Sequence, residues 1–131
     1  VLFRSTSATE RLARTRMQHG GIRVPARIVS ADDVEQGKPH PEPYRRGAAI
    51  LGLAPQDCLV IEDSASGAEA GPAAGCTVLA TLFSHSAESL RHADYIVRAL
   101  EDVQVHLPRD PGAPLVVRFT PVARDLSESV R

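Results

Sequence analysis

Short apolar runs alternate along this chain with segments whose apolar positions recur at helical spacing. Runs of strand length, bounded by polar or turn residues, predict strands at 27–29, 58–61, 77–80 and 95–97. Tyr44, Ala48 and Leu51 recur at i, i+4 and i+7 and predict a helix that begins near Glu42 and ends at Gly52. The run at 58–61 is apolar throughout, which is typical of a strand buried on both faces.

Two further helices are expected from capping patterns. The segments 7–10 and 66–69 both have the S-x-x-E form of a capping box, so helices should follow Ser7 and Ser66. Glycines should end them near residues 18 and 74, although Pro72 inside the second costs about 3 kcal/mol in a regular turn. A short helix is also expected at 87–91.

Strands that alternate with helices indicate an α/β fold, a Rossmann-like parallel sheet with helices on both faces. Beyond Val105 this pattern changes. Several prolines predict a loop, 115–119 is strand-like, and the polar stretch 125–131 is expected to be frayed. The opening five residues resemble a translated sequencing adapter, so we expect a non-native or truncated start at 1–5; the alternative is the end of a real strand.

Composition narrows the class of protein. The chain has 131 residues, of which 43% are hydrophobic and 24% charged, enough for one domain or part of one. The formal charge of −1 argues against a nucleic-acid or anionic-membrane surface, and no apolar run is long enough to span a bilayer. Cys58 and Cys76 lie in apolar runs and are predicted to be buried free thiols. We therefore expect a cytoplasmic protein with neither nucleic-acid nor membrane partners.

The distribution of basic residues singles out one position. The chain has 15 basic residues, and Lys38 is the only lysine among them. Pro39, Pro41 and Pro43 follow Lys38 and stiffen the backbone next to it, which would hold a compact ammonium group at a fixed point. A positioned cation is what phosphoryl transfer needs. The alternative is a solvated lysine in an exposed, polar loop. Of its neighbours, His40 is predicted to be a surface imidazole and Tyr44 the core anchor of the next helix.

Two other segments could carry chemistry at the carboxyl ends of strands, where open α/β sheets bind ligands. The hydroxyl pair in Thr6-Ser7-Ala8 precedes a predicted helix, whose N-terminus favours an anion such as phosphate; Ser7 could equally be only an N-cap. Glu62 and Asp63 are adjacent carboxylates after the buried strand, and hard oxygen ligands of this kind favour Mg²⁺. Here the alternative is a charged loop in which Asp63 or Ser64 merely caps the next helix.

Taken together and in this order, the segments resemble the haloacid dehalogenase-like (HAD) hydrolase superfamily. The matching motifs are its second at Ser7, its third at Lys38 and its fourth at Glu62-Asp63. The stretches 33–44 and 62–67 are especially similar to the branch of β-phosphoglucomutase and of the glycerol-phosphate and 2-deoxyglucose-6-phosphate phosphatases. The resemblance covers about residues 6–104, which would be the C-terminal part of the HAD-like core, and leaves 105–131 as an extra loop, strand and tail.

The resemblance implies roles for individual residues. Ser7 and the amide of Ala8 would bind the transferring phosphoryl group, and Lys38 would stabilise its negative charge. Thr9 could contact substrate phosphate. Asp63, with Glu62 beside it, would hold Mg²⁺. The substrate would be a small phosphorylated sugar or polyol, cleaved through an aspartyl-phosphate, and the full-length protein would be a monomer.

The family's nucleophile and acid/base are two aspartates in a D-x-D-G motif on a central strand, and no D-x-D-G occurs in this sequence. The cap domain that selects substrate is also not found. We therefore expect an N-terminally truncated fragment that lacks the nucleophile strand and is inactive alone. The parent would be a Mg²⁺-dependent phosphatase; a sugar-phosphate mutase of the same superfamily, or a short non-catalytic module that binds an anion and a metal, are the alternatives.

Overall fold

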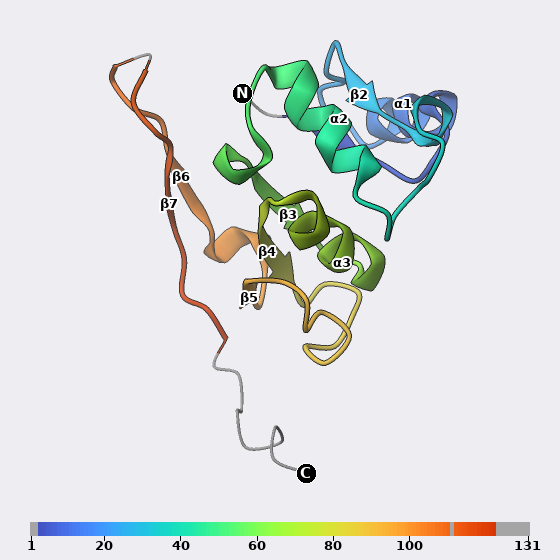
Figure 1. Ribbon diagram of the computed structural model, residues 1–131. Helices are drawn as coiled ribbons and strands as arrows, with labels where there is room; N and C mark the ends of the chain where they lie inside the picture. The colour runs from blue at the N-terminus through green and yellow to red at the C-terminus, as the bar shows by residue number, and fades with distance from the viewer. Residues whose placement is uncertain (1–2, 111, 123–131) are drawn as a thin grey trace.

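The computed structural model describes residues 3–110 and 112–122 (Figure 1). The expected strands and all three longer helices appear within two residues of their predicted bounds. The described helices and strands are β1 (Arg4–Ser5), α1 (Glu10–His19), β2 (Ile28–Val29), α2 (Glu42–Leu51), β3 (Leu59–Glu62), α3 (Ala65–Ala74), β4 (Thr77–Thr81), β5 (Tyr95–Val97), β6 (Gln104–His106) and β7 (Val116–Arg118). Short 3₁₀ turns occur at 31–33, 55–57 and 100–102.

The parallel strands fall into two groups. β1 pairs with β2, and β3, β4 and β5 form a three-stranded sheet in that order; all of these pairings are parallel. Between the two groups lies an open slot of about 160 Å³, which we call the β1–β3 slot. It is lined by both strands and by side chains of α2. The parallel α/β fold is thus confirmed, with its strands divided into two separate sheets.

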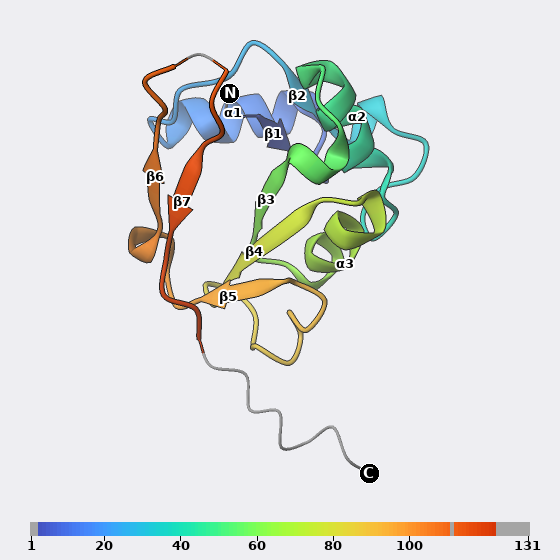
Figure 2. The same cartoon turned by 60° about the vertical axis from the view of Figure 1, so that its left-hand side comes forward.

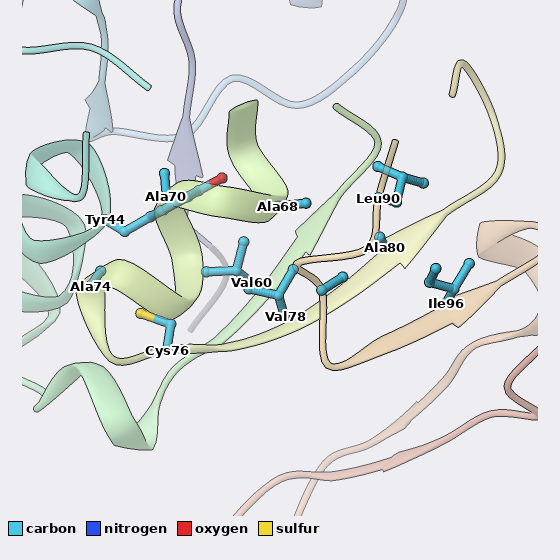
Figure 3. Close-up of a cluster of buried hydrophobic side chains, with 11 residues drawn as sticks. Tyr44, Val60, Ala68, Ala70, Ala74, Cys76, Val78, Ala80, Leu90 and Ile96 are labelled. Atoms are coloured by element: carbon cyan, nitrogen blue, oxygen red, sulfur yellow. The ribbon is translucent and has the colours of Figure 1, made fainter. Parts of the chain in front are cut away.

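The two parallel sheets differ in which of their faces are covered by helices. In both views α1 and α2 lie on opposite sides of the β1–β2 pair, while α3 packs against the β3–β4–β5 sheet (Figures 1 and 2). Val60, Val78 and Ile96 point toward α3 and form the core with its alanines (Figure 3). On the opposite face of that sheet, Leu59 and Ile61 remain 39% and 43% exposed. Helices on both faces are therefore found at β1–β2, whereas the described residues place no helix over Leu59 and Ile61.

The C-terminal region folds back onto the sheet. β7 pairs with β6, a strand that the sequence did not predict, in an antiparallel hairpin. Beyond the hairpin, the Val122 amide donates to the Ile96 carbonyl at 2.7 Å, and the Phe119 ring meets Tyr95 edge to face. Residues 119–122 therefore cover the free edge of β5. The predicted fraying of 125–131 lies outside the described residues.

Capping signals in the sequence were misplaced at two helix starts. Thr9, and not Ser7, caps α1, because its hydroxyl accepts the Leu12 amide; the cap of α3 is Ser64, and not Ser66, and it accepts the Gly67 amide. A capping box does form in the chain, at Ser30. Residues 87–91 form turns rather than the expected helix. Arg4 and Ser5, from the segment expected to be non-native, pair with β2 as a strand.

Candidate active site

Lys38 lies in the turn before α2 and points inward. Its ammonium nitrogen is 2.5 Å from Oε1 of Glu62, and both side chains are only 8% exposed. The same nitrogen is 3.4 Å from the Ser5 carbonyl oxygen and 4.7 Å from the centre of the Tyr44 ring. The Lys38–Pro39 peptide bond is cis. The interpretation of Lys38 as a solvated lysine is therefore wrong in this structure.

Glu62 is the centre of a dense hydrogen-bond network at the end of β3. Its Oε1 accepts from Lys38 and from the Tyr44 hydroxyl, and its Oε2 accepts from the amides of Asp63 and Ser64 and from the Ser64 hydroxyl. Burial by itself would raise the pKa of Glu62, but the Lys38 charge and these donors lower it below its ordinary value. Gly67 makes room for this carboxylate, because a Cβ there would overlap it. Glu62 therefore anchors Lys38.

Tyr44, which lies on α2, contacts both Lys38 and Glu62. It is buried, as the sequence predicted for a core anchor, and it also donates its hydroxyl hydrogen to Glu62. Burial and the neighbouring Glu62 carboxylate raise the pKa of Tyr44, so its hydroxyl stays protonated and acts as a donor. The polar role of Tyr44 was not predicted, because its helical spacing indicates only burial.

Asp63 is held differently from Glu62. The Ser84 hydroxyl oxygen lies 2.9 Å from Oδ2 of Asp63 and 3.0 Å from its carbonyl oxygen. None of the described residues donates a hydrogen bond to Oδ1 of Asp63, so that oxygen can accept a ligand. Ser84 follows β4, and nothing in the sequence pattern singled it out.

The N-terminus of α1 is more fully occupied than predicted. The Ala8 amide donates to the Thr6 hydroxyl at 3.1 Å, the Thr9 hydroxyl accepts the Leu12 amide, and the Glu10 amide donates to a carboxylate oxygen of Asp32 at 2.8 Å. These amides already have acceptors, and Asp32 places a negative charge where an anion was expected. The Ser7 side chain is exposed and contributes to none of these bonds.

The structure brings Lys38, Glu62 and Tyr44 together, and it brings the end of β1 to them through the Ser5 carbonyl. For Mg²⁺, Asp63 fits as a ligand because one of its oxygens is free, whereas both oxygens of Glu62 are engaged by protein donors. Within residues 3–110 and 112–122, no three His, Cys, Asp or Glu side chains are grouped to hold a metal. The same residues contain no helix long and apolar enough to cross a membrane.

A buried cation and an available carboxylate at the carboxyl ends of parallel strands define an α/β protein with a charged ligand site. A family model described as haloacid dehalogenase-like hydrolase matches residues 2–81. The chain belongs to the haloacid dehalogenase-like hydrolase family.

Curated relatives agree with this family. The chain is 36% identical over 113 residues to hexitol phosphatase A of Escherichia coli, covering 86% of this chain and 51% of that protein. It is 40% identical over 110 residues to glycerol-1-phosphate phosphohydrolase 2 of Saccharomyces cerevisiae, covering 77% and 44%. The chain thus spans about half the length of the curated relatives it matches.

Solved structures give the same result. A HAD family hydrolase from Deinococcus radiodurans, determined with bound phosphate and sodium, is 33% identical with a TM-score of 0.66, over 76% of this chain and 48% of that one. A β-phosphoglucomutase from Clostridium difficile is 27% identical with a TM-score of 0.63, over 75% and 43%. With the phosphatases above, these neighbours support the β-phosphoglucomutase-like branch that the sequence resembles.

Proposed function

We propose that this chain is the C-terminal part of a Mg²⁺-dependent phosphatase that hydrolyses small sugar or polyol phosphate monoesters through an aspartyl-phosphate. The observation that carries the proposal is the buried Lys38–Glu62 pair at the end of β3. A charged pair is costly to bury, and a protein retains one most readily where a fixed charge is used. The named activities of the relatives, hexitol phosphatase and glycerol-1-phosphate phosphohydrolase, support the substrate class.

Lys38 would act on the phosphoryl oxygens. An ammonium group has three hydrogens. One is directed to Glu62 and one lies near the Ser5 carbonyl, which leaves one for a phosphoryl oxygen. Glu62, Tyr44 and the prolines that follow Lys38 fix the ammonium group before substrate arrives, so that little reorganisation is needed as charge develops.

Hydroxyl groups at the end of β1 would bind the same phosphate. Ser7 remains our proposal for this role, with its hydroxyl free of internal bonds. The Ala8 amide and the Thr9 hydroxyl would take part only after exchanging the partners they have here, Thr6 and the Leu12 amide. Thr6 directly follows Ser5, whose carbonyl oxygen Lys38 approaches, and we add its hydroxyl to the phosphate-binding set.

The nucleophile would come from a further strand in the β1–β3 slot. The slot separates two parallel strands whose facing edges are not paired to each other, and it is lined by backbone and side chains of both. The buried Ser5 hydroxyl oxygen, which also lines the slot, has no hydrogen-bond partner among the described residues. A strand bearing the family's D-x-D-G motif would satisfy these edges and bring two aspartates beside Lys38 and Asp63.

Asp63 would hold Mg²⁺ through its free oxygen, together with ligands from that strand. When bound, the ion would neutralise charge on the phosphoryl oxygens and orient the phosphate. Glu62 was expected as a second ligand. In this structure its role is to hold Lys38, and we propose that it acts on the metal site only through that charge.

The test is phosphate release by the full-length protein that contains this chain, assayed with a panel of hexitol, hexose and glycerol phosphates with and without Mg²⁺. Turnover that requires Mg²⁺ and is lost in Asp63→Asn supports the proposal. A full-length protein that binds these esters without turnover would instead be a non-catalytic anion- and metal-binding module. We further propose that the full-length protein is a cytoplasmic monomer with neither nucleic-acid nor membrane partners.

A sugar-phosphate mutase is the second candidate, because a β-phosphoglucomutase is among the similar structures. The same assay separates the two activities. A mutase converts a hexose 1-phosphate to the 6-phosphate without net phosphate release, whereas a phosphatase releases phosphate from both. Product analysis by ³¹P NMR distinguishes these outcomes directly.

A further inference from the structure

The loop after β4 contains two hydrogen-bonded residues, Ser84 and His85, that have no part in the proposed function. The Ser84 hydroxyl oxygen lies 2.9 Å from Asp63 Oδ2, 3.0 Å from the Asp63 carbonyl oxygen and 2.9 Å from Nδ1 of His85. It therefore links the candidate metal ligand that follows β3 to an imidazole 22 residues further along the chain.

Counting hydrogens fixes the direction of these bonds. A serine hydroxyl has a single hydrogen to donate, and the carboxylate and carbonyl oxygens of Asp63 can only accept. If the hydroxyl donated to His85, no hydrogen would lie between Ser84 and either Asp63 oxygen. The arrangement that satisfies all of the contacts has Ser84 sharing its one hydrogen between the two Asp63 oxygens and His85 donating from Nδ1–H to Ser84.

We propose that Ser84 is a positioning residue for Asp63 and that His85 orients the Ser84 hydroxyl. This rests on the proposed role of Asp63 as a Mg²⁺ ligand. The Ser84 bond occupies Oδ2 and also ties the hydroxyl to the Asp63 backbone, so the carboxylate is held in one rotamer with Oδ1 directed to a ligand. Partners that orient a metal-ligating carboxylate in this way contribute strongly to metal affinity.

The same argument explains why a serine suits this position. Ser84 is exposed, so burial does not select its residue type, and a water molecule could replace a hydroxyl that only satisfied Asp63. A hydroxyl attached to the backbone of the loop holds the carboxylate without the mobility of a water. Loss of this bond should therefore affect metal binding more than stability.

The experiment measures Mg²⁺ affinity of the full-length protein by isothermal titration calorimetry in Ser84→Ala, Ser84→Thr, Asp63→Asn and Ser86→Ala. Ser86 is the matched control, because it is an exposed serine in the same loop whose hydroxyl lies 3.0 Å from Ser89 and not near Asp63. We expect about tenfold weaker Mg²⁺ binding in Ser84→Ala, recovery of at least half of that loss in Ser84→Thr, and no change in Ser86→Ala.

A second readout does not depend on metal or activity. In the metal-free protein, ¹⁵N NMR of the imidazole should show His85 in the Nδ1–H tautomer, and Ser84→Ala should remove that signature. Mg²⁺ affinity within twofold of wild type in Ser84→Ala, while Asp63→Asn binds weakly, would overturn the positioning role of Ser84 alone. Unchanged affinity in Asp63→Asn would overturn the metal role of Asp63, and with it the proposed function. An Nε2–H tautomer in the wild-type protein would overturn the role of His85.

Discussion

At the scale of single residues, the candidate site of this protein is built around a lysine and a glutamate that lie far apart in sequence. Lys38 and Glu62 each have side chains that are 8% exposed, and each would be costly to bury alone. Together with the Tyr44 hydroxyl they form one unit centred on Glu62, in which the loss of Glu62 leaves both Lys38 and Tyr44 without their carboxylate acceptor.

The first prediction concerns the shape of the Lys38 cation. Lys38→Arg in the full-length enzyme should lower kcat by about 100-fold or more, since a guanidinium group is wider and cannot place a point charge in the same space. Steady-state phosphate release measures the effect, and circular dichroism checks that the variant is folded. Arg45→Lys, an exposed swap on α2, is the control and should have near-wild-type kcat. A folded Lys38→Arg enzyme with normal kcat would remove Lys38 from the mechanism.

The second prediction concerns pH. The pKa of Glu62 in the folded protein lies below its ordinary value of 4.5, so the ionised carboxylate stabilises the fold above that pH. This contribution should be lost as pH falls through the lowered pKa. Asp33, whose pKa is lowered by its hydrogen bonds to the Ser30 amide and hydroxyl, acts in the same direction.

Thermal melts between pH 3 and pH 7 are compared for the full-length protein and its Lys38→Met/Glu62→Gln double variant. The difference between them is the contribution of the Lys38–Glu62 pair to the pH dependence of Tm. The wild type should lose more of its Tm than the double variant between about pH 5 and pH 3, because the double variant retains Asp33 but has no ionisable pair. Parallel curves for the two proteins would show that the Glu62 pKa is not lowered.

At the scale of secondary-structure elements, the sequence predicted which helices and strands exist better than it predicted where the helices begin. Apolar runs identified β3, β4 and β5, because strands of a parallel sheet are typically near-continuous apolar runs. The cap of α1 was misplaced because several hydroxyl residues in a row can each accept an amide, and the choice depends on Asp32, which is distant in sequence. β6 was missed because its pairing with β7 depends on a partner and not on its own pattern.

At the candidate site, likewise, the sequence identified some residues but not their roles. Lys38 could be found from its uniqueness and its prolines, and Glu62 and Asp63 from their place after β3. Their different roles could not be found, because they depend on Tyr44, Ser64 and Ser84 approaching from other elements. Sequence patterns report which residues are near the end of a strand, and tertiary packing decides which carboxylate turns toward which donor.

The third prediction tests how α3 makes room for Glu62. Gly67→Ala should destabilise the full-length protein by about 1–3 kcal/mol, since the new Cβ would overlap the Glu62 carboxylate and displace it from Lys38. Chemical denaturation gives the free energy of unfolding. Gly112→Ala is the control, because a Cβ at Gly112 has no atom within 4 Å, and it should leave stability unchanged. Equal stability of the two variants would contradict the overlap.

The fourth prediction tests the cover of β5. Val122→Pro should destabilise the full-length protein by about 1–3 kcal/mol, because proline removes the amide hydrogen donated to Ile96 and leaves that carbonyl unpaired. Val122→Ala keeps the amide and loses only side-chain packing, so comparing the two variants separates the bond from the contact. If both variants lose equal stability, the bond contributes nothing.

At the scale of the whole molecule, the main feature is the separation of the parallel strands into two sheets. The β1–β3 slot separates two parallel sheets, and apolar side chains of β3 remain partly exposed beside it. Sheet edges of this kind promote association with other strands. The fold is therefore complete in its core around α3 and open at its centre.

The fifth prediction follows from this opening. The 131 residues expressed alone should aggregate or melt without a cooperative transition, and should release no phosphate from sugar phosphates. The full-length protein should melt cooperatively. Size-exclusion chromatography and thermal melts with and without Mg²⁺ measure the difference. A soluble, cooperatively melting and active fragment would show that the slot needs no further strand and that another residue supplies the nucleophile.

Because Lys38 is the only lysine, this chain has a single side-chain amine available to amine-directed reagents. That amine is buried against Glu62, so its rate of acylation is set by how often the pair opens. The rate of amine labelling, followed by intact-mass measurement, would thus report how often the Lys38–Glu62 pair opens, with the N-terminal amine as the internal reference.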